Sequence, residues 1–168
     1  MKISWKSQDS HIIQNSKAEM SLGDFDINIK PAHIWLATSG TTARAKLVGL
    51  SKRAFLNSAE AVNSHINCTD SDVWIQALPK FHVGGLSIEA RAFLSGASVF
   101  GGLKSNFSWD AETFVLETHV WEGTLTSLVP TQIFDLVNKK IVAPKSLRAV
   151  FVGGAHLSPG LYLAAREL

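Results

Sequence analysis

The fold class is decided by residues 73–100, which read VWIQALPKFHVGGLSIEARAFLSGASVF. The mostly apolar run 73–78 predicts a buried strand that ends at Pro79. A helix over about 86–94 follows and ends at Gly96, a residue suited to a left-handed C-terminal cap. Residues 97–100 again have the pattern of a strand. A strand, a helix and another strand in this order predict a parallel pair within an α/β fold.

The same alternation extends to both sides of this stretch. Ser51 is expected to cap a helix, and Pro130 and Pro159 are expected to open two others. The pattern predicts an α/β fold with layers, in which a mostly parallel sheet is flanked by helices. Ligands of such sheets bind beyond the carboxyl ends of the strands, so the loops that follow strands are candidates for one shared site. The other predicted strands are 34–37, 47–50, 124–129 and 147–152; the other predicted helices are 52–66, 110–117, 131–138 and one from 159 onward.

The chain length of 168 residues fits one domain. Residues 1–32 are polar and aperiodic, and the pattern does not decide their structure, whereas residues 33–168 are expected to form a partial α/β domain. The helical pattern at the C-terminus has no Gly or Pro stop, so we expect the domain to be truncated there; a natural end that frays is the alternative. A cut domain would expose apolar surface through which a homodimer can form.

The composition excludes several classes of function. The net charge is only +2, and no basic stripe is present, which argues against nucleic acid as a partner. No apolar run is long enough for a membrane span, and no signal peptide is visible. Because Cys68 is the single cysteine, no internal disulfide can form, which suits the cytoplasm. The histidines lack metal-ligand spacing, so no metal site is predicted.

The first functional motif is a hydroxyl-rich loop that follows the predicted strand 34–37. It reads Thr38-Ser39-Gly40-Thr41-Thr42-Ala43-Arg44-Ala45-Lys46. Phosphate binding needs freed backbone N–H groups, short hydroxyl side chains and a cation, and this loop offers all three. It is not a Walker A loop, because no Gly-Lys-Ser/Thr occurs at the required spacing. A Ser/Thr-rich turn without a ligand is the alternative interpretation.

This loop resembles the phosphate loop of the acyl-adenylate-forming superfamily, which includes acyl-CoA synthetases, luciferases and peptide-synthetase adenylation domains. The superfamily pattern is Thr-Ser-Gly-Thr-Thr-Gly-x-Pro-Lys. Ala43 stands at its second glycine and Ala45 at its proline. The resemblance implies that ATP phosphates are bound by the residues Thr38, Ser39, Gly40, Thr41, Thr42 and Lys46.

Two further segments carry the same resemblance. Residues 78–86, LPKFHVGGL, are similar to a Leu-Pro-x-Phe-His-x-x-Gly segment that borders the acyl pocket and the route of CoA. Residues 127–132, SLVPTQ, and 150–157, VFVGGAHL, are similar to later turns, the second of which lies against the adenine and the acyl group. The resemblance implies an acyl or CoA pocket formed by His82, Gly84, Gly85 and Thr131, and an adenine or acyl site formed by Gly153, Gly154 and Ala155. It assigns no catalytic residue.

Within the superfamily, these segments are most similar to those of the o-succinylbenzoate–CoA ligases of menaquinone synthesis, over roughly residues 33–160. The resemblance implies an acid–CoA ligase that uses a small carboxylate, with ATP, Mg²⁺ and CoA as co-substrates of the complete enzyme and none of them tightly bound. The family's Mg²⁺, ribose and C-terminal lysine motifs have no counterpart here, so we expect this chain alone to be inactive. The alternatives are a non-catalytic nucleotide- or acyl-binding module and a degenerate remnant.

Overall fold

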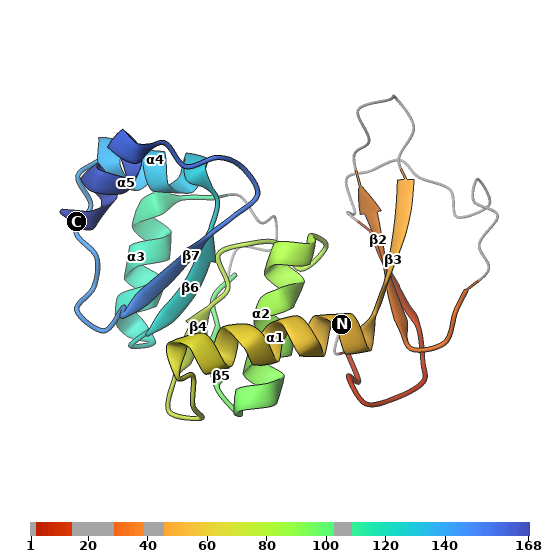
Figure 1. Ribbon diagram of the computed structural model, residues 1–168. Helices are drawn as coiled ribbons and strands as arrows, with labels where there is room; N and C mark the ends of the chain where they lie inside the picture. Colours follow the sequence, from red (N-terminus) through yellow and green to blue (C-terminus); the bar gives the residue numbers. More distant parts are fainter. Residues whose placement is uncertain (1–2, 15–28, 39–45, 103–108) are drawn as a thin grey trace.

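The computed structural model describes residues 3–14, 29–38, 46–102 and 109–168. Within them, two sheets lie at opposite ends of the molecule and are bridged by helix α1 (Lys52–Ile66), as Figure 1 shows. The predicted fold class is confirmed: a mixed α/β structure with a parallel sheet flanked by helices. No helix of these residues is long and apolar enough to cross a membrane.

The smaller sheet contains the strands β1 (His11–Ile13), β2 (His33–Thr38) and β3 (Lys46–Ser51), in that order. β1 is parallel to β2, whereas β2 and β3 are antiparallel. The antiparallel pairing has a simple cause. Only seven residues connect β2 to β3, and a parallel crossover needs a dozen or more.

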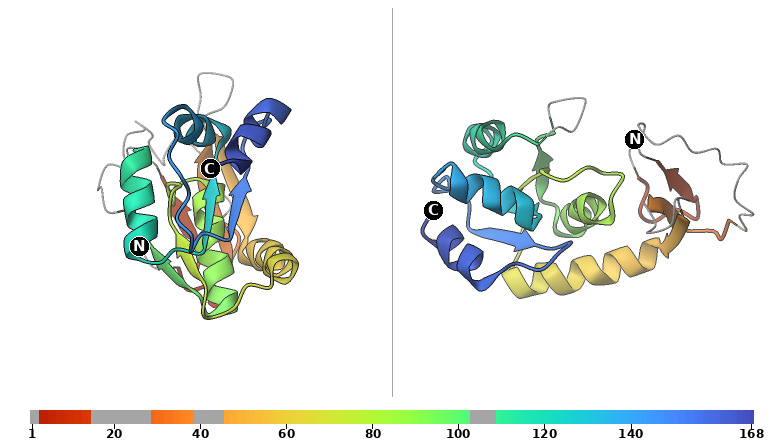
Figure 2. Two further views of the ribbon diagram at one scale, coloured as in Figure 1. Left: turned by 90° about the vertical axis from the view of Figure 1, so that its left-hand side faces the viewer. Right: turned by 90° about the horizontal axis from the view of Figure 1, so that it is seen from above.

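The larger sheet is entirely parallel and has the strand order β5-β4-β6-β7. Its helices follow the predicted alternation. α2 covers one face together with α1, and α3, α4 and α5 cover the other, as the two further views in Figure 2 show. The bounds are β4 Val73–Ile75, α2 Val83–Ser95, β5 Ser98–Phe100, α3 Ala111–Val120, β6 Leu125–Leu128, α4 Pro130–Asn138, β7 Ala149–Val152 and α5 Pro159–Arg166.

Three apolar clusters hold these layers together. The first joins the smaller sheet to α1 and α2 and includes Trp5, which is 5% exposed and packs on Phe55 with ring centroids 5.7 Å apart. The second lies between the parallel sheet and α3, α4 and α5, and the third lies between that sheet and α2. Residues before position 33 therefore contribute a strand, β1, and a core tryptophan to the structure.

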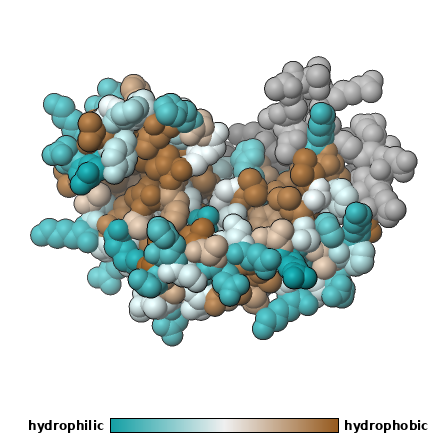
Figure 3. Space-filling view, in the orientation of Figure 1, coloured by the Kyte–Doolittle hydropathy of each residue, from teal (hydrophilic) through white to brown (hydrophobic). Residues whose placement is uncertain are grey.

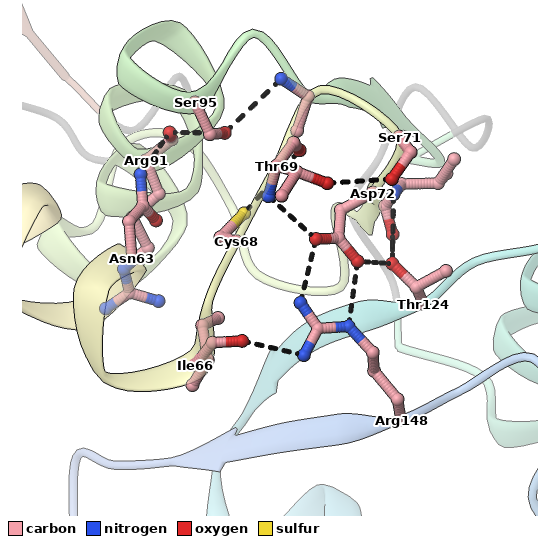
Figure 4. A network of polar contacts seen from close by, with 12 residues as sticks. Asn63, Ile66, Cys68, Thr69, Ser71, Asp72, Arg91, Ser95, Thr124 and Arg148 are labelled. Atoms are coloured by element: carbon pink, nitrogen blue, oxygen red, sulfur yellow. Dashed lines mark hydrogen bonds and ion pairs between the residues drawn. The ribbon is translucent and has the colours of Figure 1, made fainter.

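A polar network ties the amino ends of the parallel strands together (Figure 4). Asp72, which directly precedes β4, accepts hydrogen bonds from Arg148, from the Thr124 hydroxyl at 2.7 Å and from the Thr69 backbone N–H at 3.0 Å. Arg148 also donates to the carbonyl of Ile66 at the end of α1. The ion pair and its hydrogen bonds thus connect the amino ends of β4, β6 and β7. The carboxyl ends of the strands are not part of this network.

Candidate functional site

An open cavity of about 390 Å³ lies where β4 and β6 end. Its walls come from the segment after β4, from the start of α4 and from α3. Since these strands are parallel, their carboxyl ends meet at one edge of the sheet, the usual ligand position in such folds. The lining residues are Gln76, Ala77, Leu78, Pro79, His82, Gly102, Trp109, Asp110, Thr113, Phe114, Glu117, Val129, Thr131 and Gln132.

His82 is exposed, lines this cavity and occupies the N-cap position of α2. Its backbone N–H donates to the carbonyl of Pro79 at 3.1 Å, which closes a tight turn before the helix. The two glycines that follow start the helix against this turn. A Cβ atom at position 85 would lie 2.2 Å from the Pro79 carbonyl oxygen, so only glycine fits Gly85. At Gly84 the corresponding contact is 3.1 Å, to a Leu78 methyl group.

Thr131 enters the same cavity from the first turn of α4, next to Val129 and Gln132. Pro130 occupies the first position of this helix, where its missing N–H has no intrahelical acceptor to lose. The structure therefore brings together two predicted pocket residues, His82 and Thr131, that are 49 positions apart in the sequence.

The segment Gly153-Gly154-Ala155 leaves β7 beside the end of β6. The N–H of Gly153 donates to the Leu128 carbonyl at 3.2 Å, and a Cβ at Gly154 would lie 3.3 Å from a methyl of Val129. Gly154 has a φ of 86°, a left-handed conformation that favours glycine. All three residues are exposed, and they adjoin the cavity without lining it.

The two residues that flank the predicted phosphate loop, Thr38 and Lys46, belong to the smaller sheet. Thr38 ends β2 and Lys46 begins β3, and their Cα atoms are register partners. Ser39, Gly40, Thr41 and Thr42 lie outside the described residues. The segments after β4 and β6 thus line one cavity, whereas Thr38 and Lys46 belong to the antiparallel pair β2–β3.

Arg91 was not predicted; it lies on α2 and does not itself line the cavity. Its guanidinium stacks over Trp74 at 5.3 Å and Phe151 at 5.0 Å, and its Nη1 donates to the Ser127 hydroxyl at 3.0 Å. Burial lowers the pKa of Arg91 below its ordinary value. Among the described residues no carboxylate pairs with it, and its Nε has no hydrogen-bond partner.

Gln76 and Gln132 are two further polar residues of the cavity that were not predicted as site residues; both are buried. A glutamine at the exit of a strand carries no distinctive pattern. Burial of its amide is the signal that identifies it, and burial requires the fold. The part of the chain that the structure describes holds no group of three His, Cys, Asp or Glu side chains able to bind a metal ion.

The chain is similar in sequence and in structure to enzymes of one known family. The family model described as AMP-binding enzyme matches residues 27–168. The 2-succinylbenzoate–CoA ligase of Escherichia coli (strain K12) is 38% identical over 131 residues, which cover 77% of this chain and 26% of that protein. The ligase of the same name from Staphylococcus epidermidis is 31% identical over 137 residues, with 82% of this chain and 28% of that protein covered.

A solved structure shows the same arrangement of elements. O-succinylbenzoate CoA synthetase (MenE) from Bacillus subtilis, in complex with the acyl-adenylate intermediate OSB-AMP, matches with a TM-score of 0.71 and 27% identity. The match covers 80% of this chain and 27% of that one. The same synthetase has also been solved in complex with ATP and a magnesium ion. The chain therefore spans a little over a quarter of the length of these relatives.

Proposed function

Because the chain belongs to the AMP-binding enzyme family, we propose that it forms the acyl- and phosphate-binding part of an ATP-dependent o-succinylbenzoate–CoA ligase. Its relatives are acid–CoA ligases of this name, and it spans 26% to 28% of their length. The activity proposed here is thus that of a longer protein. We propose that the remainder of that protein carries the Mg²⁺, ribose and C-terminal lysine motifs that have no counterpart in these residues.

The observation that carries the proposal is the cavity at the carboxyl ends of β4 and β6. His82 and Thr131 reach it from the starts of two different helices, although only the fold brings them together. Its walls combine apolar surface, from Phe114 and Trp109, with a few polar side chains. Pockets for small organic ligands have this composition: apolar walls for binding and a small number of polar groups for orientation.

The proposed reaction has two steps. The substrate carboxylate attacks the α-phosphorus of ATP, which gives an acyl-adenylate and pyrophosphate, and the CoA thiol then displaces AMP. Lys46 and the hydroxyls of residues 38–42 bind the departing phosphates and neutralise their charge. His82 and Thr131 border the acyl group, and Gly153–Ala155 lie toward the adenylate. The described residues offer no cluster of metal ligands, so no step is assigned to a metal held by this chain.

Arg91 supports a dicarboxylate as the substrate. o-Succinylbenzoate has one carboxylate to be activated and a second that stays charged. A partly buried cation without an acidic partner among the described residues is costly, and a ligand carboxylate would provide the missing charge. Because aromatic rings hold the guanidinium in place, it is preorganised for a planar anion.

Calorimetry on the 168-residue chain tests the binding function. We expect binding of ATP and tighter binding of a non-hydrolysable o-succinylbenzoyl-adenylate analogue. Lys46→Ala should weaken the binding of ATP by about tenfold, as loss of one charged phosphate contact does, and should have little effect on the analogue, which lacks the β- and γ-phosphates. Lys145→Ala, which removes another exposed lysine, is the matched control and should leave both affinities unchanged. A folded chain that binds neither ligand would contradict the proposal.

The substrate is tested on the longer protein that contains this chain. We expect CoA ligation with o-succinylbenzoate and much slower ligation with benzoate or fatty acids; turnover of only the latter would contradict the proposed substrate.

A second candidate function is a nucleotide- or acyl-binding module without ligase activity. Ala43 and Ala45, which replace the glycine and proline of the superfamily loop, favour it. Adenylate binding without pyrophosphate release by the longer protein would decide for this second function.

A further inference from the structure

Two buried glutamine side chains form hydrogen bonds with the backbone of the segment that follows β4. Gln76 is 3% exposed and Gln132 is 6% exposed, and both line the cavity. They come from different elements: Gln76 directly follows β4, whereas Gln132 lies in the first turn of α4. Within the described part of the chain each amide binds backbone groups only, and each connects the segment after β4 to the start of a different helix.

Gln76 connects β4 to α2. Its Nε2 donates to the carbonyl of Leu78 at 2.5 Å and to that of Gly85 at 3.1 Å. Since both partners are acceptors, the atom that binds them must be the nitrogen, which fixes the orientation of the amide. These two bonds pin both ends of the segment 78–85, and His82 lies inside it. Close packing of Gly85 against the Pro79 carbonyl keeps the two ends in contact.

Gln132 connects the same segment to α4. Its Nε2 donates to the Ala77 carbonyl at 3.1 Å, and its Oε1 accepts from the backbone N–H of Val129 at 2.9 Å. One partner is an acceptor and the other a donor, so this amide also has a single orientation. It holds the end of β6 and the first turn of α4, which carries Thr131, at a fixed distance from the exit of β4.

From these contacts we infer that Gln76 and Gln132 are positioning residues of the acyl site, which fix His82 and Thr131 relative to each other across the cavity. The inference rests on the proposed function for the identity of the ligand. The two amides act through the backbone. Together they turn the exit of β4 into a rigid link between the two helices that carry the pocket residues.

A contribution to the stability of the fold does not by itself explain why a glutamine occupies position 76. Its Oε1 is buried and has no hydrogen-bond partner among the described residues, an arrangement that costs free energy. A methionine of similar length would fill the same volume without a buried polar atom. What glutamine provides and methionine does not is the pair of hydrogen bonds to the carbonyls of Leu78 and Gly85.

The test compares Gln76→Met and Gln132→Met with a matched control, Thr118→Val. Thr118 is fully buried and donates to the Phe114 carbonyl at 2.7 Å, so its replacement also removes a buried hydrogen bond. This bond lies within α3, and Thr118 itself does not line the cavity. Amide hydrogen exchange is measured at His82 and Leu86, whose N–H groups close the turn and begin the helix. The N–H of Leu125 in β6 serves as the internal reference for global unfolding.

We expect Gln76→Met to speed exchange at His82 and Leu86 by about tenfold or more relative to Leu125, while Thr118→Val changes this ratio less than about twofold. Gln132→Met should weaken binding of the o-succinylbenzoyl-adenylate analogue by about tenfold at a temperature where all variants are folded. Thr118→Val should bind like the unaltered chain.

Equal exchange ratios in Gln76→Met and Thr118→Val would overturn the inference, as would unchanged analogue affinity in both methionine variants. Failure of the unaltered chain to bind the analogue would contradict the proposed function instead, and the exchange experiment would still decide whether the amides hold the segment.

Discussion

Arg148 binds Asp72 through two parallel hydrogen bonds, from Nε to Oδ1 at 2.8 Å and from Nη2 to Oδ2 at 2.7 Å. The two residues are 76 positions apart, and they join the starts of β4 and β7. The Asp72 carboxylate is almost fully buried, whereas the Arg148 side chain is 39% exposed. The hydrogen bonds of Arg148 hold the pKa of Asp72 well below its usual range, against the effect of burial, which raises it.

The Asp72–Arg148 pair should make stability depend on acid pH. Because the folded-state pKa is lowered, the contribution is fully present above the unfolded pKa of about 3.9 and is lost as pH falls below it. Asp72→Asn should reduce the free energy of unfolding by about 2 kcal/mol at pH 7. Urea unfolding at several pH values should show this difference narrowing below about pH 5. A constant difference down to pH 2 would contradict the assignment.

The exposed pair Lys139–Glu112 is the control for this experiment. Glu112→Gln should leave the free energy of unfolding unchanged, because water screens a pair at the surface.

Gly85→Ala should disrupt the turn before α2. The added Cβ would lie 2.2 Å from the Pro79 carbonyl oxygen and 2.6 Å from that of Leu78, and these backbone atoms must move to admit it. We expect a loss of about 2–3 kcal/mol in thermal or chemical unfolding. Gly160→Ala is the control, since a Cβ at that helical position meets no atom within 4 Å. It should be neutral or stabilising by up to about 1 kcal/mol.

Lys52→Met should release the N-terminal segment. The buried ammonium donates to the Ser4 carbonyl at 2.7 Å, the Ser7 carbonyl at 3.2 Å and the Ser7 hydroxyl at 3.1 Å. We expect a loss of about 1–2 kcal/mol in unfolding free energy and faster proteolysis within residues 3–14. Equal proteolysis of both chains would show that the packing of Trp5 and the pairing of β1 with β2 hold the segment without Lys52.

Arg91→Met should change the affinity for the ligand much more than the free energy of unfolding. It removes a partly buried cation that has no acidic partner among the described residues, but it also removes the stacking on Trp74 and Phe151. The unfolding free energy should therefore change by less than about 1 kcal/mol. Affinity for the o-succinylbenzoyl-adenylate analogue should fall by at least about tenfold, whereas affinity for a benzoyl-adenylate analogue should stay the same. Equal losses for both analogues would argue against contact with a second carboxylate.

Local sequence signals predicted most elements of the fold. The helix 52–66 was predicted with its exact bounds, because the Ser51 side chain caps it by accepting from the Ala54 N–H. The strand predicted over 73–78 ends at Ile75 instead. The backbone N–H of Gln76 still reaches the Phe100 carbonyl, and the chain then turns toward the cavity. Apolar composition alone could not distinguish that turn from more strand.

Other features depend on contacts between distant residues. β1 has only three residues and forms because β2 offers it a parallel partner. The antiparallel pairing of β2 with β3 and the division of the strands into two sheets were not revealed by the alternating pattern. Among the pocket residues, His82 and Thr131 were predicted through family resemblance. The buried amides of Gln76 and Gln132 were not predicted as pocket residues, since their role comes from the carbonyl groups that the fold places beside them.

The last strand of the parallel sheet has a consequence for how the chain behaves in solution. Among the described residues β7 pairs only with β6, and its alternate side chains Val150 and Val152 are 38% and 36% exposed. Hydrophobic side chains gather over this part of the surface, near α4 and α5, in Figure 3. An uncovered strand edge beside apolar surface is a template for cross-strand aggregation. The unaltered chain should therefore aggregate at high protein concentration, and a charged residue at position 150 or 152 should reduce this aggregation.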